Sequence, residues 1–330
     1  MSVKFLIIRF SSIGDIVLTT PVIRCLKRQV EEAEVHFLVK KQFQEVVSAN
    51  PYIDSIHLFE GNLRQTIRNL RKENYHYIID LHHSLRSAII KRRTDALSFT
   101  FRKLNFRKWL LVRFHLNLLP DLHIVDRYLE TVALFDVVND GQGLDYFIPT
   151  EGEVPLNRLP ENFSNGYVAL VVGANHATKR LTTDMIVALC RLIPFPVLLL
   201  GGAGEQDEGE RIALDAGSHV WNGCGKYSIA QSASLLRQAR IVVTHDTGMM
   251  HIAAAFHKII ISIWGNTVPE FGMSPYMPDP RSMIVEVKNL SCRPCSRIGF
   301  ERCPRKHFRC ILQIPLDDIA QTVSELYRSD

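Results

Sequence analysis

The sequence predicts an α/β protein with two doubly wound, Rossmann-like domains. Strand-like segments rich in β-branched residues alternate with segments of helical periodicity, an arrangement typical of βαβ units and parallel sheets. The alternation pauses once, over residues 141–166, where Gly, Pro, Asn and Glu are frequent and a linker is predicted. A chain of 330 residues, 46% of them hydrophobic and 22% charged, is long enough for two such domains.

The elements follow in order from local hydrophobic periodicity. In the first half, we expect strands over residues 3–9, 35–39, 55–59 and 77–81, and helices over residues 16–30, 43–49 and 63–73. In the second half, we expect strands over residues 167–172, 197–200, 219–221, 241–243 and 258–264, and helices over residues 183–193, 206–216, 229–237, 249–256 and 315–327. The predicted domains are residues 1–155 and 156–314, with the last helix, about 315–330, packing back on the first domain.

Hydropathy and charge restrict the class of protein. No run of eighteen uncharged apolar residues occurs, so no transmembrane helix is expected, and the opening MSVKFLIIRF is interpreted as a strand rather than a signal peptide. We therefore expect a cytoplasmic protein. The net charge of +5 arises in the first half, and nine basic residues between Arg86 and Arg113 are opposed by Asp95 alone.

Charge alone leaves two kinds of anionic partner open, phospholipid head groups and nucleic acid. Aromatic and aliphatic residues such as Phe99, Phe106 and Trp109 interrupt the basic stretch, which favours a membrane interface. We expect no nucleic-acid partner. A solvated loop face is the alternative interpretation of the same residues.

The stretch THDTGMMHIAAA, residues 244–255, places polar residues where a buried strand gives way to an apolar helix. Asp246 and Thr247 are positioned to cap the helix, and Gly248 lets the backbone approach a ligand. Free amides and the helix dipole at this point favour an anion such as a diphosphate. An ordinary N-cap without a ligand remains the alternative, and His251 is equally consistent with a core histidine.

Three further loops follow neighbouring strands of the second half. GANHATKRL, residues 173–181, supplies Thr178, Lys179 and Arg180 as cationic or polar partners for a diphosphate. LLLGGAGEQDE, residues 198–208, offers Glu205 and Asp207 for ribose hydroxyls, and WGNTVPE, residues 264–270, adds a fourth loop. Because ligands of doubly wound sheets bind at the carboxyl ends of strands, the four loops predict a nucleotide-sugar pocket.

The first half carries a second set of candidates at its strand ends. In RFSSIGDIVLTTP, residues 9–21, a carboxylate enters the helix at Asp15, where it can cap the helix or take a proton from an acceptor hydroxyl. In DLHHSLRS, residues 80–87, Arg86 suits a carboxylate or phosphate of an acceptor, and Arg127 is a weaker candidate that could instead be a buried ion-pair partner. We expect the two sets of loops to face each other across a cleft. The predicted acceptor-binding residues are Ser12, Asp80, Ser84, Arg86 and Arg127.

Absent motifs and the cysteines limit the chemistry. The sequence contains no Asp-x-Asp motif, phosphate-binding P-loop, dinucleotide fingerprint, nucleophile elbow or HExxH motif. These absences argue against a metal-dependent sugar transferase, an NTPase, a dehydrogenase, an esterase and a metalloprotease. Four cysteines cluster with His307 near the C-terminus, where a structural zinc, disulfides and reduced thiols are all open. The possible zinc ligands are Cys292, Cys295, Cys303 and Cys310.

These residues together resemble glycosyltransferase family nine, the ADP-heptose:lipopolysaccharide heptosyltransferases. The resemblance covers nearly the whole chain and rests on RFSSIGDIVLTTPVIRCLK, GANHATKRL, THDTGMMHIAAA, SIWGNTVPE and the tail CRPCSRIGFERCPRKHFRC. It implies a GT-B fold, inversion at the anomeric carbon, no metal requirement and no cofactor beyond the ADP-sugar substrate. The implied acceptor is the core saccharide linked to lipid A, reached by peripheral association with the cytoplasmic face of the inner membrane.

The resemblance also assigns roles to individual residues. It implies that Asp15 is the general base and that Lys179 stabilises the departing diphosphate as a second catalytic residue. It assigns the first domain to the acceptor and the second to the donor. The residues that it and the loop pattern assign to donor binding are Gly14, Thr178, Lys179, Glu205, Asp246, Thr247, Gly248, Met249 and His251.

Two other functions remain compatible with the sequence. A sugar-nucleotide epimerase of the same fold would need further acid–base carboxylates, and no convincing second one is found. A non-catalytic binder in a surface-polysaccharide pathway is opposed by the joint presence of Asp15, Lys179 and Asp246.

Overall fold

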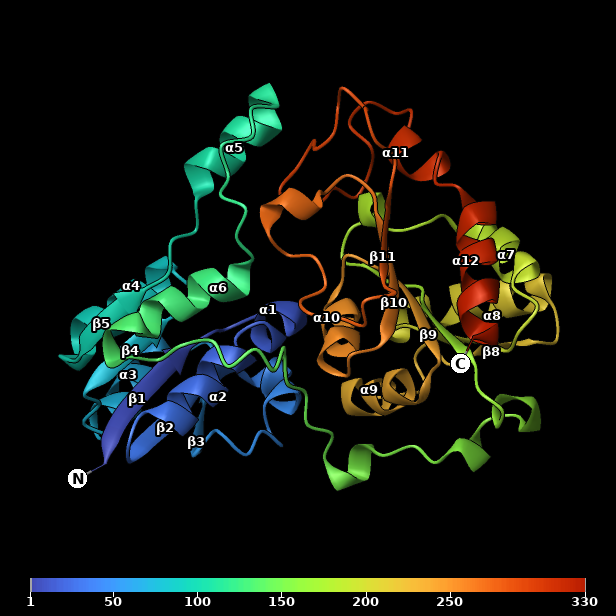
Figure 1. The fold of residues 1–330 in the computed structure, drawn as a ribbon. Coiled ribbons are helices and arrows are strands. Elements are labelled where there is room, and N and C mark those ends of the chain that lie inside the picture. The colour runs from blue at the N-terminus through green and yellow to red at the C-terminus, as the bar shows by residue number, and fades with distance from the viewer. Residues whose placement is uncertain (1, 330) are drawn as a thin grey trace. The chain divides into compact units, whose positions relative to one another are not determined.

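The computed structural model describes residues 2–329, which divide into two compact units (Figure 1). Unit 1 comprises the chain up to Leu104 together with Leu122–Pro149, and unit 2 comprises Asn105–Asp121 together with the chain from Thr150 onwards. The boundary therefore falls a few residues before the predicted one at 155. A segment that the sequence placed in the first domain, residues 105–121, belongs to unit 2 by its contacts.

Unit 1 contains one parallel sheet of five strands in the order β3-β2-β1-β4-β5. The strands are β1 (Val3–Ile8), β2 (Ala33–Lys40), β3 (Ser55–Phe59), β4 (Tyr77–Asp80) and β5 (Leu97–Thr100). The helices are α1 (Ile13–Val17), α2 (Thr20–Gln29), α3 (Leu63–Arg71), α4 (Leu85–Thr94) and α6 (Ile124–Leu129), with 3-10 turns at Lys41–Val46 and Glu130–Phe135.

Unit 2 contains a parallel sheet of six strands in the order β11-β10-β9-β6-β7-β8. The strands are β6 (Val168–Val171), β7 (Val197–Leu200), β8 (Val220–Asn222), β9 (Ile241–His245), β10 (Ile259–Trp264) and β11 (Met283–Glu286). The helices are α5 (Asn105–Phe114), α7 (Thr183–Leu192), α8 (Gln206–Ala216), α9 (Ile229–Gln238), α10 (Gly248–Ala255), α11 (Arg309–Leu312) and α12 (Leu316–Arg328). Short 3-10 turns lie at Thr150–Gly152, Leu156–Arg158, Glu161–Phe163, Ala177–Lys179, Ala203–Glu205 and Pro269–Phe271.

Two doubly wound parallel sheets confirm the predicted fold class, and this architecture is the GT-B type. The strands β6, β7, β9 and β10 are buried along their whole length, as expected for parallel strands covered by helices on both faces. This explains why their sequences are continuous apolar runs.

The single helix predicted over residues 16–30 is two helices, α1 and α2. The hydroxyls of Thr19 and Thr20 donate to the carbonyls of Ile16 and Val17, at 2.6 and 2.7 Å, and so turn the chain back on the end of α1. Pro21 then lies at the start of α2, where its missing N–H costs no hydrogen bond.

The C-terminal helix α12 packs within unit 2, which corrects the expectation that it returns to the first domain. Ile319, Val323 and Tyr327 belong to the apolar core of unit 2, and the Tyr327 ring stacks on Phe195 with ring centroids 3.9 Å apart. The apolar stripe of α12 packs against α7 within unit 2.

The strand order determines where each unit can hold a ligand. In unit 1 the order reverses between β1 and β4, and in unit 2 it reverses between β6 and β9. Connections diverge at these points and leave a crevice at the carboxyl ends of the strands. The loops after β1, β4, β6 and β9 carry most of the predicted site residues.

Within residues 2–329, no helix combines the length and the apolar composition that crossing a bilayer requires.

A buried arginine joins α2 to the end of unit 1, and its removal should destabilise that unit. Arg24 is 1% exposed and pairs with Asp140 at 2.8 Å and with Asp145, while donating to the Gly143 carbonyl. We predict that Arg24→Met lowers the free energy of unfolding by about 3 kcal/mol, because two carboxylates lose their partner. Urea denaturation checks this, with Lys41→Met as the control.

Lys41 forms a single exposed pair with Glu60, so the control should change the free energy of unfolding by about 0.5 kcal/mol or less. Equal losses in the two variants would contradict the structural role given to Arg24.

Candidate functional site

In unit 2, the loops after β6, β9 and β10 converge on one carboxylate. The Lys179 Nζ lies 2.5 Å from an Asp246 side-chain oxygen, and the Thr267 hydroxyl donates to the same oxygen at 2.9 Å. Lys179 also donates to the Asp246 carbonyl at 3.4 Å. The structure therefore brings together two predicted donor-binding residues and adds Thr267, whose loop was noted in the sequence but whose side chain was not singled out.

The beginning of α10 lies beside this contact. The helix begins at Gly248, and in the described chain the side chain of its N-cap residue, Thr247, makes no capping hydrogen bond. Asp246, the other predicted cap, is engaged by Lys179 and Thr267 instead. The first-turn amides of α10 therefore face the loops without a side-chain acceptor, and amides of this kind bind anions.

Two further predicted residues flank this helix start. Met249 lies in the first turn of α10 and is half-buried. Glu205 accepts a hydrogen bond from the Gly202 amide at 2.9 Å, and a Cβ at Gly173 would lie 2.9 Å from the Glu205 carboxyl carbon. Glu205 thus lies between the loops that follow β6 and β7, and the absence of a side chain at Gly173 makes room for it.

Two predicted donor-binding side chains are buried, which corrects those assignments. Thr178 is 1% exposed, and its hydroxyl hydrogen-bonds to Asn266 and to the Phe300 backbone. His251 is 2% exposed within α10. Thr178 joins two loops, and the burial of His251 is in keeping with the core histidine that the sequence left open as an alternative.

His245, at the end of β9, holds the Lys179 loop in place. Its ring is 1% exposed, and its Nε2 accepts the Leu181 amide at 3.0 Å, so Nε2 carries no proton. Burial, helped by the nearby Arg180 charge, lowers the pKa of His245 to about 4. The sequence showed His245 inside the motif but did not reveal this positioning role.

The cysteine-rich tail braces the same loops. Arg293 pairs with Glu286 at 2.7 Å and donates to the carbonyls of Gly265 and Thr267 at 2.5 and 2.7 Å. These contacts fix the loop that presents Thr267 to Asp246. The sequence analysis did not predict a role for Arg293, because a charged residue in a loop belongs to no periodic pattern.

The structure does not support the zinc site predicted as one possibility for the tail. Among residues 2–329, no group of three or more His, Cys, Asp or Glu side chains is arranged to hold a metal ion. In the described chain all seven cysteines are free, and Cys292, Cys295, Cys303 and Cys310 take part in no disulfide.

In unit 1, Asp15 closes the first turn of α1. One carboxylate oxygen accepts the Ser12 amide at 3.2 Å and the Ser12 hydroxyl at 2.8 Å, and the other lies 2.8 Å from Arg9 Nη2. Burial works to raise the pKa of Asp15, but Arg9 and the Ser12 hydrogen bonds outweigh it, so the net pKa is lowered. Asp15 keeps 21% of its side chain exposed, and Gly14 beside it is buried.

Arg9 connects Asp15 to the rest of the sheet edge. Its Nη1 donates to the Leu81 carbonyl at the end of β4, at 2.5 Å, and to the Tyr128 hydroxyl of α6 at 3.0 Å. The guanidinium is 7% exposed. Arg9 and Tyr128 are site residues that the sequence analysis missed, although Arg9 opens the motif that contains Asp15.

Two predicted acceptor-binding residues are buried, which corrects their roles. Asp80 is fully buried, accepts the His82 and His83 amides at 3.1 and 2.8 Å, and pairs with Lys91 at 2.9 Å. Its carboxylate therefore shapes the loop after β4. Arg127 is 4% exposed, and burial lowers its pKa.

The remaining acceptor candidates lie at the start of α4. Ser84 is the N-cap residue, and its hydroxyl accepts the Ser87 amide at 3.3 Å. Arg86 is exposed, with its guanidinium 5.8 Å from the centre of the Phe59 ring. Arg86 is thus the predicted acceptor residue that presents a charge at the surface of unit 1.

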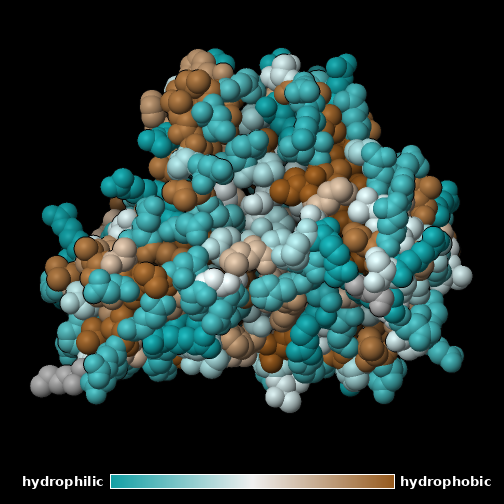
Figure 2. Space-filling model, viewed as in Figure 1, coloured by the Kyte–Doolittle hydropathy of each residue, from teal (hydrophilic) through white to brown (hydrophobic). Residues whose placement is uncertain are grey.

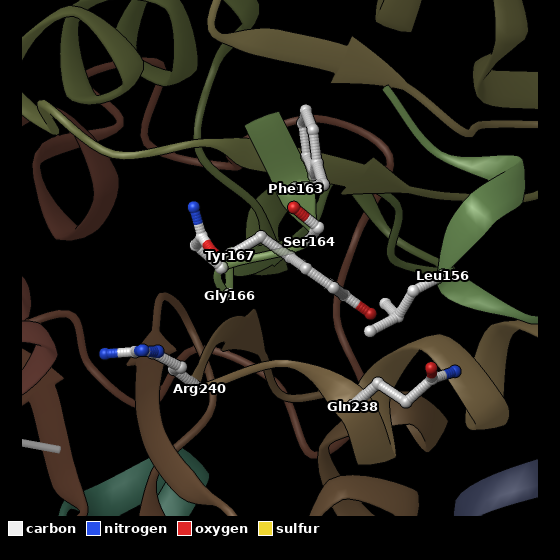
Figure 3. Close-up of a pocket in the computed structure, with 8 residues that line it drawn as sticks. Leu156, Phe163, Ser164, Gly166, Tyr167, Gln238 and Arg240 are labelled. Atoms are coloured by element: carbon white, nitrogen blue, oxygen red, sulfur yellow. The ribbon is translucent and has the colours of Figure 1, made fainter. Parts of the chain in front are cut away.

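A shallow hollow of about 570 Å³ lies at the opposite end of the unit 2 strands, where β6 and β9 begin (Figure 3). Tyr167 and Arg240, which line it, precede β6 and β9, whereas the polar loops follow these strands. Arg240 donates to the Tyr327 carbonyl at 3.1 Å and lies over the Tyr327 ring. Its charge therefore serves to attach α12, and the hollow is separate from the converging loops.

Comparison with known proteins identifies the family. The model of glycosyltransferase family 9 (heptosyltransferase) matches residues 63–302. This chain belongs to glycosyltransferase family 9. The recognition made from the motifs is therefore confirmed, and the chain is a glycosyltransferase.

Lipopolysaccharide heptosyltransferase 1 of Campylobacter coli is 25% identical over 98% of this chain and 99% of its own length. The enzyme of the same name from Pseudomonas aeruginosa is 26% identical over 88% of this chain and 86% of its own length.

Solved structures agree on the fold of this family 9 chain. The ADP-heptose lipopolysaccharide heptosyltransferase II of Escherichia coli matches with a TM-score of 0.75 at 18% identity, covering 99% of both chains. The E. coli heptosyltransferase WaaC with ADP matches with a TM-score of 0.72 at 19% identity, covering 98% of this chain and 99% of that one.

The buried His245 of this glycosyltransferase should make the stability of unit 2 depend on pH. Its folded-state pKa of about 4 is below the unfolded value, so its contribution is fully present above about pH 6.5 and declines as the pH falls towards 4. The loss attributable to His245 should approach about 3 kcal/mol. Urea denaturation across this range, compared with His245→Gln, checks it.

Glutamine can still accept the Leu181 amide but does not titrate, so its stability should fall less steeply. His257→Gln, at an exposed position, is the control and should keep the wild-type pH dependence. Parallel curves for all three proteins would contradict the assignment.

Proposed function

We propose that this chain transfers heptose from ADP-heptose to the core saccharide of lipopolysaccharide, with inversion at the anomeric carbon. The names of the similar proteins support the reaction, since relatives over nearly the whole chain are lipopolysaccharide heptosyltransferases. The structural match to a heptosyltransferase with ADP supports the nucleotide. The donor and the acceptor are the parts of this proposal to be tested.

One observation in the structure carries the donor half of the proposal. The start of α10 has amides without a side-chain cap, and Lys179 lies beside it through its contact with Asp246. Backbone amides and an ammonium group together match the charge of a diphosphate. In this proposal, Thr247, Gly248 and Met249 line the diphosphate, and Glu205 holds the ribose hydroxyls.

The acceptor half rests on Asp15. Because its pKa is lowered, the carboxylate is ionised at neutral pH, as a general base must be. We propose that it takes the proton of an acceptor hydroxyl while that oxygen bonds to the anomeric carbon. The bond from the anomeric carbon to the diphosphate oxygen breaks, and its electron pair leaves with ADP.

The departing diphosphate gains negative charge during this step. Lys179 and the α10 amides are preorganised donors that would stabilise this charge, a contribution usually worth a large part of catalysis. These groups supply positive charge of the kind that a divalent ion provides in other transferases, and this is the basis for proposing a metal-independent reaction. Arg86, exposed on unit 1, and Ser12 and Ser84 are proposed to contact the acceptor.

A sugar-nucleotide epimerase is the less favoured alternative. Such a reaction needs a second acid–base carboxylate, and the nearest candidate in unit 1, Asp80, is buried and paired with Lys91. A non-catalytic binder would have no use for an ionised, partly exposed Asp15. We further propose that the enzyme works in the cytoplasm, associated peripherally with the inner membrane, and binds no nucleic acid.

The donor assignment predicts selective binding of ADP-sugars. Isothermal titration with ADP-heptose, a UDP-sugar and a GDP-sugar should give measurable affinity for the ADP-sugar alone, and incubation with acceptor should yield a heptosylated product. Lys179→Met should reduce kcat by roughly a hundredfold or more, because one charged donor to the leaving group is lost.

Lys226→Met, at an exposed lysine paired with Glu210, is the matched control and should leave kcat unchanged. A preference for UDP or GDP, or conversion of the donor without acceptor, would overturn the proposed reaction.

The base assignment predicts a separation between binding and turnover. Asp15→Asn should bind the ADP-sugar as the wild type does but lower kcat by roughly a hundredfold or more, since it cannot accept a proton. In the wild type, kcat/KM should fall on the acid side as Asp15 is protonated, at a pH below the ordinary range of a carboxyl group.

Arg9→Lys keeps a positive charge but loses the guanidinium that contacts Asp15 while donating to Leu81 and Tyr128, so the acid limb should move to higher pH. An unchanged acid limb in this variant, or full turnover by Asp15→Asn, would show that Asp15 is not the base.

A further inference from the structure

The helix α5 has two apolar faces, and one of them remains exposed. On its inner side, Leu111 packs with Val268 and Phe271 in a small buried cluster, with Val112 at its margin. Lys108 lies over the Phe271 ring, 5.7 Å from its centre. These contacts fix α5 to unit 2 and account for the apolar residues of the inner face.

The outer side of α5 and the residues that follow it are apolar without a buried partner. The large exposed side chains there, with exposed fractions of 70, 48, 59, 50 and 48%, are Phe106, Trp109, Phe114, Leu116 and Leu118. The Phe106 and Trp109 rings stack with centroids 5.9 Å apart, and Trp109 meets Phe114 edge-on at 5.4 Å. Figure 2 shows hydrophobic residues gathered over α5. An exposed cluster of this kind marks an interaction site.

The charges on this segment have one sign. Residues 105–120 contain Arg107, Lys108 and Arg113 and no acidic residue. Arg107 and Arg113 are exposed beside the aromatic cluster. The partner of this face is therefore expected to be both anionic and apolar.

The cysteine-rich tail extends the same surface. Arg297 donates to the Asn105 side chain at 3.2 Å, which places the tail against the start of α5. Beside it, Ile298 is 66% exposed and Phe300 is 38% exposed. Further exposed basic residues of the tail are Arg302, Arg305, Lys306 and Arg309, with Glu301 as the one acidic residue between Arg297 and Arg309.

This combination differs from other exposed apolar residues of unit 2. Leu214 is 84% exposed on α8, but that helix also carries Asp207, Glu208, Glu210 and Asp215. Residues 151–330 as a whole have equal numbers of basic and acidic residues, 18 of each. Within unit 2, the net positive charge therefore comes from residues 105–121, where Arg107, Lys108 and Arg113 are opposed by Asp121 alone.

We propose that α5 and the tail form a membrane-docking surface that binds an anionic phospholipid bilayer. The α5 surface, defined as Phe106, Trp109, Phe114, Leu116 and Leu118 with Arg107 and Arg113, inserts its rings at the level of the head groups while the arginines pair with phosphates. Tryptophan and phenylalanine favour this interfacial position, and each basic side chain adds attraction to an anionic leaflet. The proposal deepens the proposed function and rests on it, because a lipid-linked acceptor is presented at a membrane.

The test is cosedimentation of the full chain with vesicles. Binding is expected to vesicles of phosphatidylglycerol and phosphatidylethanolamine, to weaken as salt is raised, and to be much weaker with phosphatidylcholine alone. Arg107→Glu should reduce the partition coefficient at least roughly fivefold, the effect of one basic side chain near the surface. Trp109→Ser combined with Phe114→Ser should reduce it roughly tenfold or more, by removing the inserted rings.

Each variant has a control of the same chemistry elsewhere in unit 2. Arg158→Glu makes the same charge change at another exposed position, and Leu214→Ser removes an apolar side chain that is more exposed than Trp109. Both controls should bind as the wild type does. Tryptophan emission should shift to the blue on binding and should lose that shift in Trp109→Phe, since Trp264 is buried and Trp221 is half-buried in the edge strand β8.

Several outcomes would overturn the docking surface. These are no binding of the wild type to anionic vesicles, equal loss in the control variants, and wild-type binding by the α5 variants. Sedimentation showing a dimer that Trp109→Ser and Phe114→Ser dissociate would assign the face to a second copy of the chain instead.

Transfer to a soluble, deacylated core saccharide separates this proposal from the enzymatic one. The α5 variants should retain wild-type kcat on that acceptor, because none of the substituted residues belongs to the donor or base sites. A wild type that transfers heptose without binding vesicles would refute the docking surface alone. Vesicle binding without transfer would refute the proposed reaction alone.

Discussion

Parallel pairing of neighbouring strands at the switch points is the constraint on which both candidate sites depend. In unit 2, β6 pairs with β9, so the loops after these strands emerge side by side, and Lys179 reaches Asp246 although 67 residues separate them. In unit 1, β1 pairs with β4, and Arg9 accordingly reaches the Leu81 carbonyl. In both units, the pairing of the two strands brings the contacting residues together.

Asp246 binds Lys179 and Thr267 and does not cap α10, and this makes the start of α10 a candidate anion site. A Thr at the N-cap position, as at Thr247, commonly accepts a first-turn amide through its side chain, but Thr247 makes no such hydrogen bond. Here Lys179 and Thr267 bind the carboxylate, and the amides of α10 are left open. The same Lys179 charge is thus held at the helix start, so the ammonium and the dipole act on one place.

Much of the fold followed from the sequence because buried parallel strands are continuous apolar runs. The strands β3 and β7 were predicted with their observed limits. The helix over residues 16–30 was predicted too long, since the Thr19 and Thr20 hydroxyls break it through hydrogen bonds that periodicity does not reveal. The strands β5 and β11 were missed, because each has four residues of which at most one is buried, and so gives only a short hydrophobic signal.

The sequence predicted which loops form the candidate sites more reliably than it predicted which side chains of those loops are exposed. Strand ends indicated the right loops, but which residue of a loop points outward depends on local packing. Asp80 and Thr178 are polar and lie in the right loops, yet both are buried and satisfied by neighbouring backbone groups. Arg9 and Arg293 act through carbonyls that are distant in the sequence, and such contacts leave no short-range pattern.

The tail shows how a sequence motif can be right in location and wrong in chemistry. Its spacing suggested a metal, whereas the structure uses it as a brace: Arg293 holds the carbonyls of Gly265 and Thr267, and the Phe300 backbone exchanges hydrogen bonds with the Thr178 hydroxyl. Gly299 lies against His176, where a Cβ would come within 2.6 Å of the His176 Cβ. The tail thus packs closely against the loops after β6 and β10. The position of Thr267 against Asp246 depends on this packing, which is a reason for the tail to accompany the donor motifs.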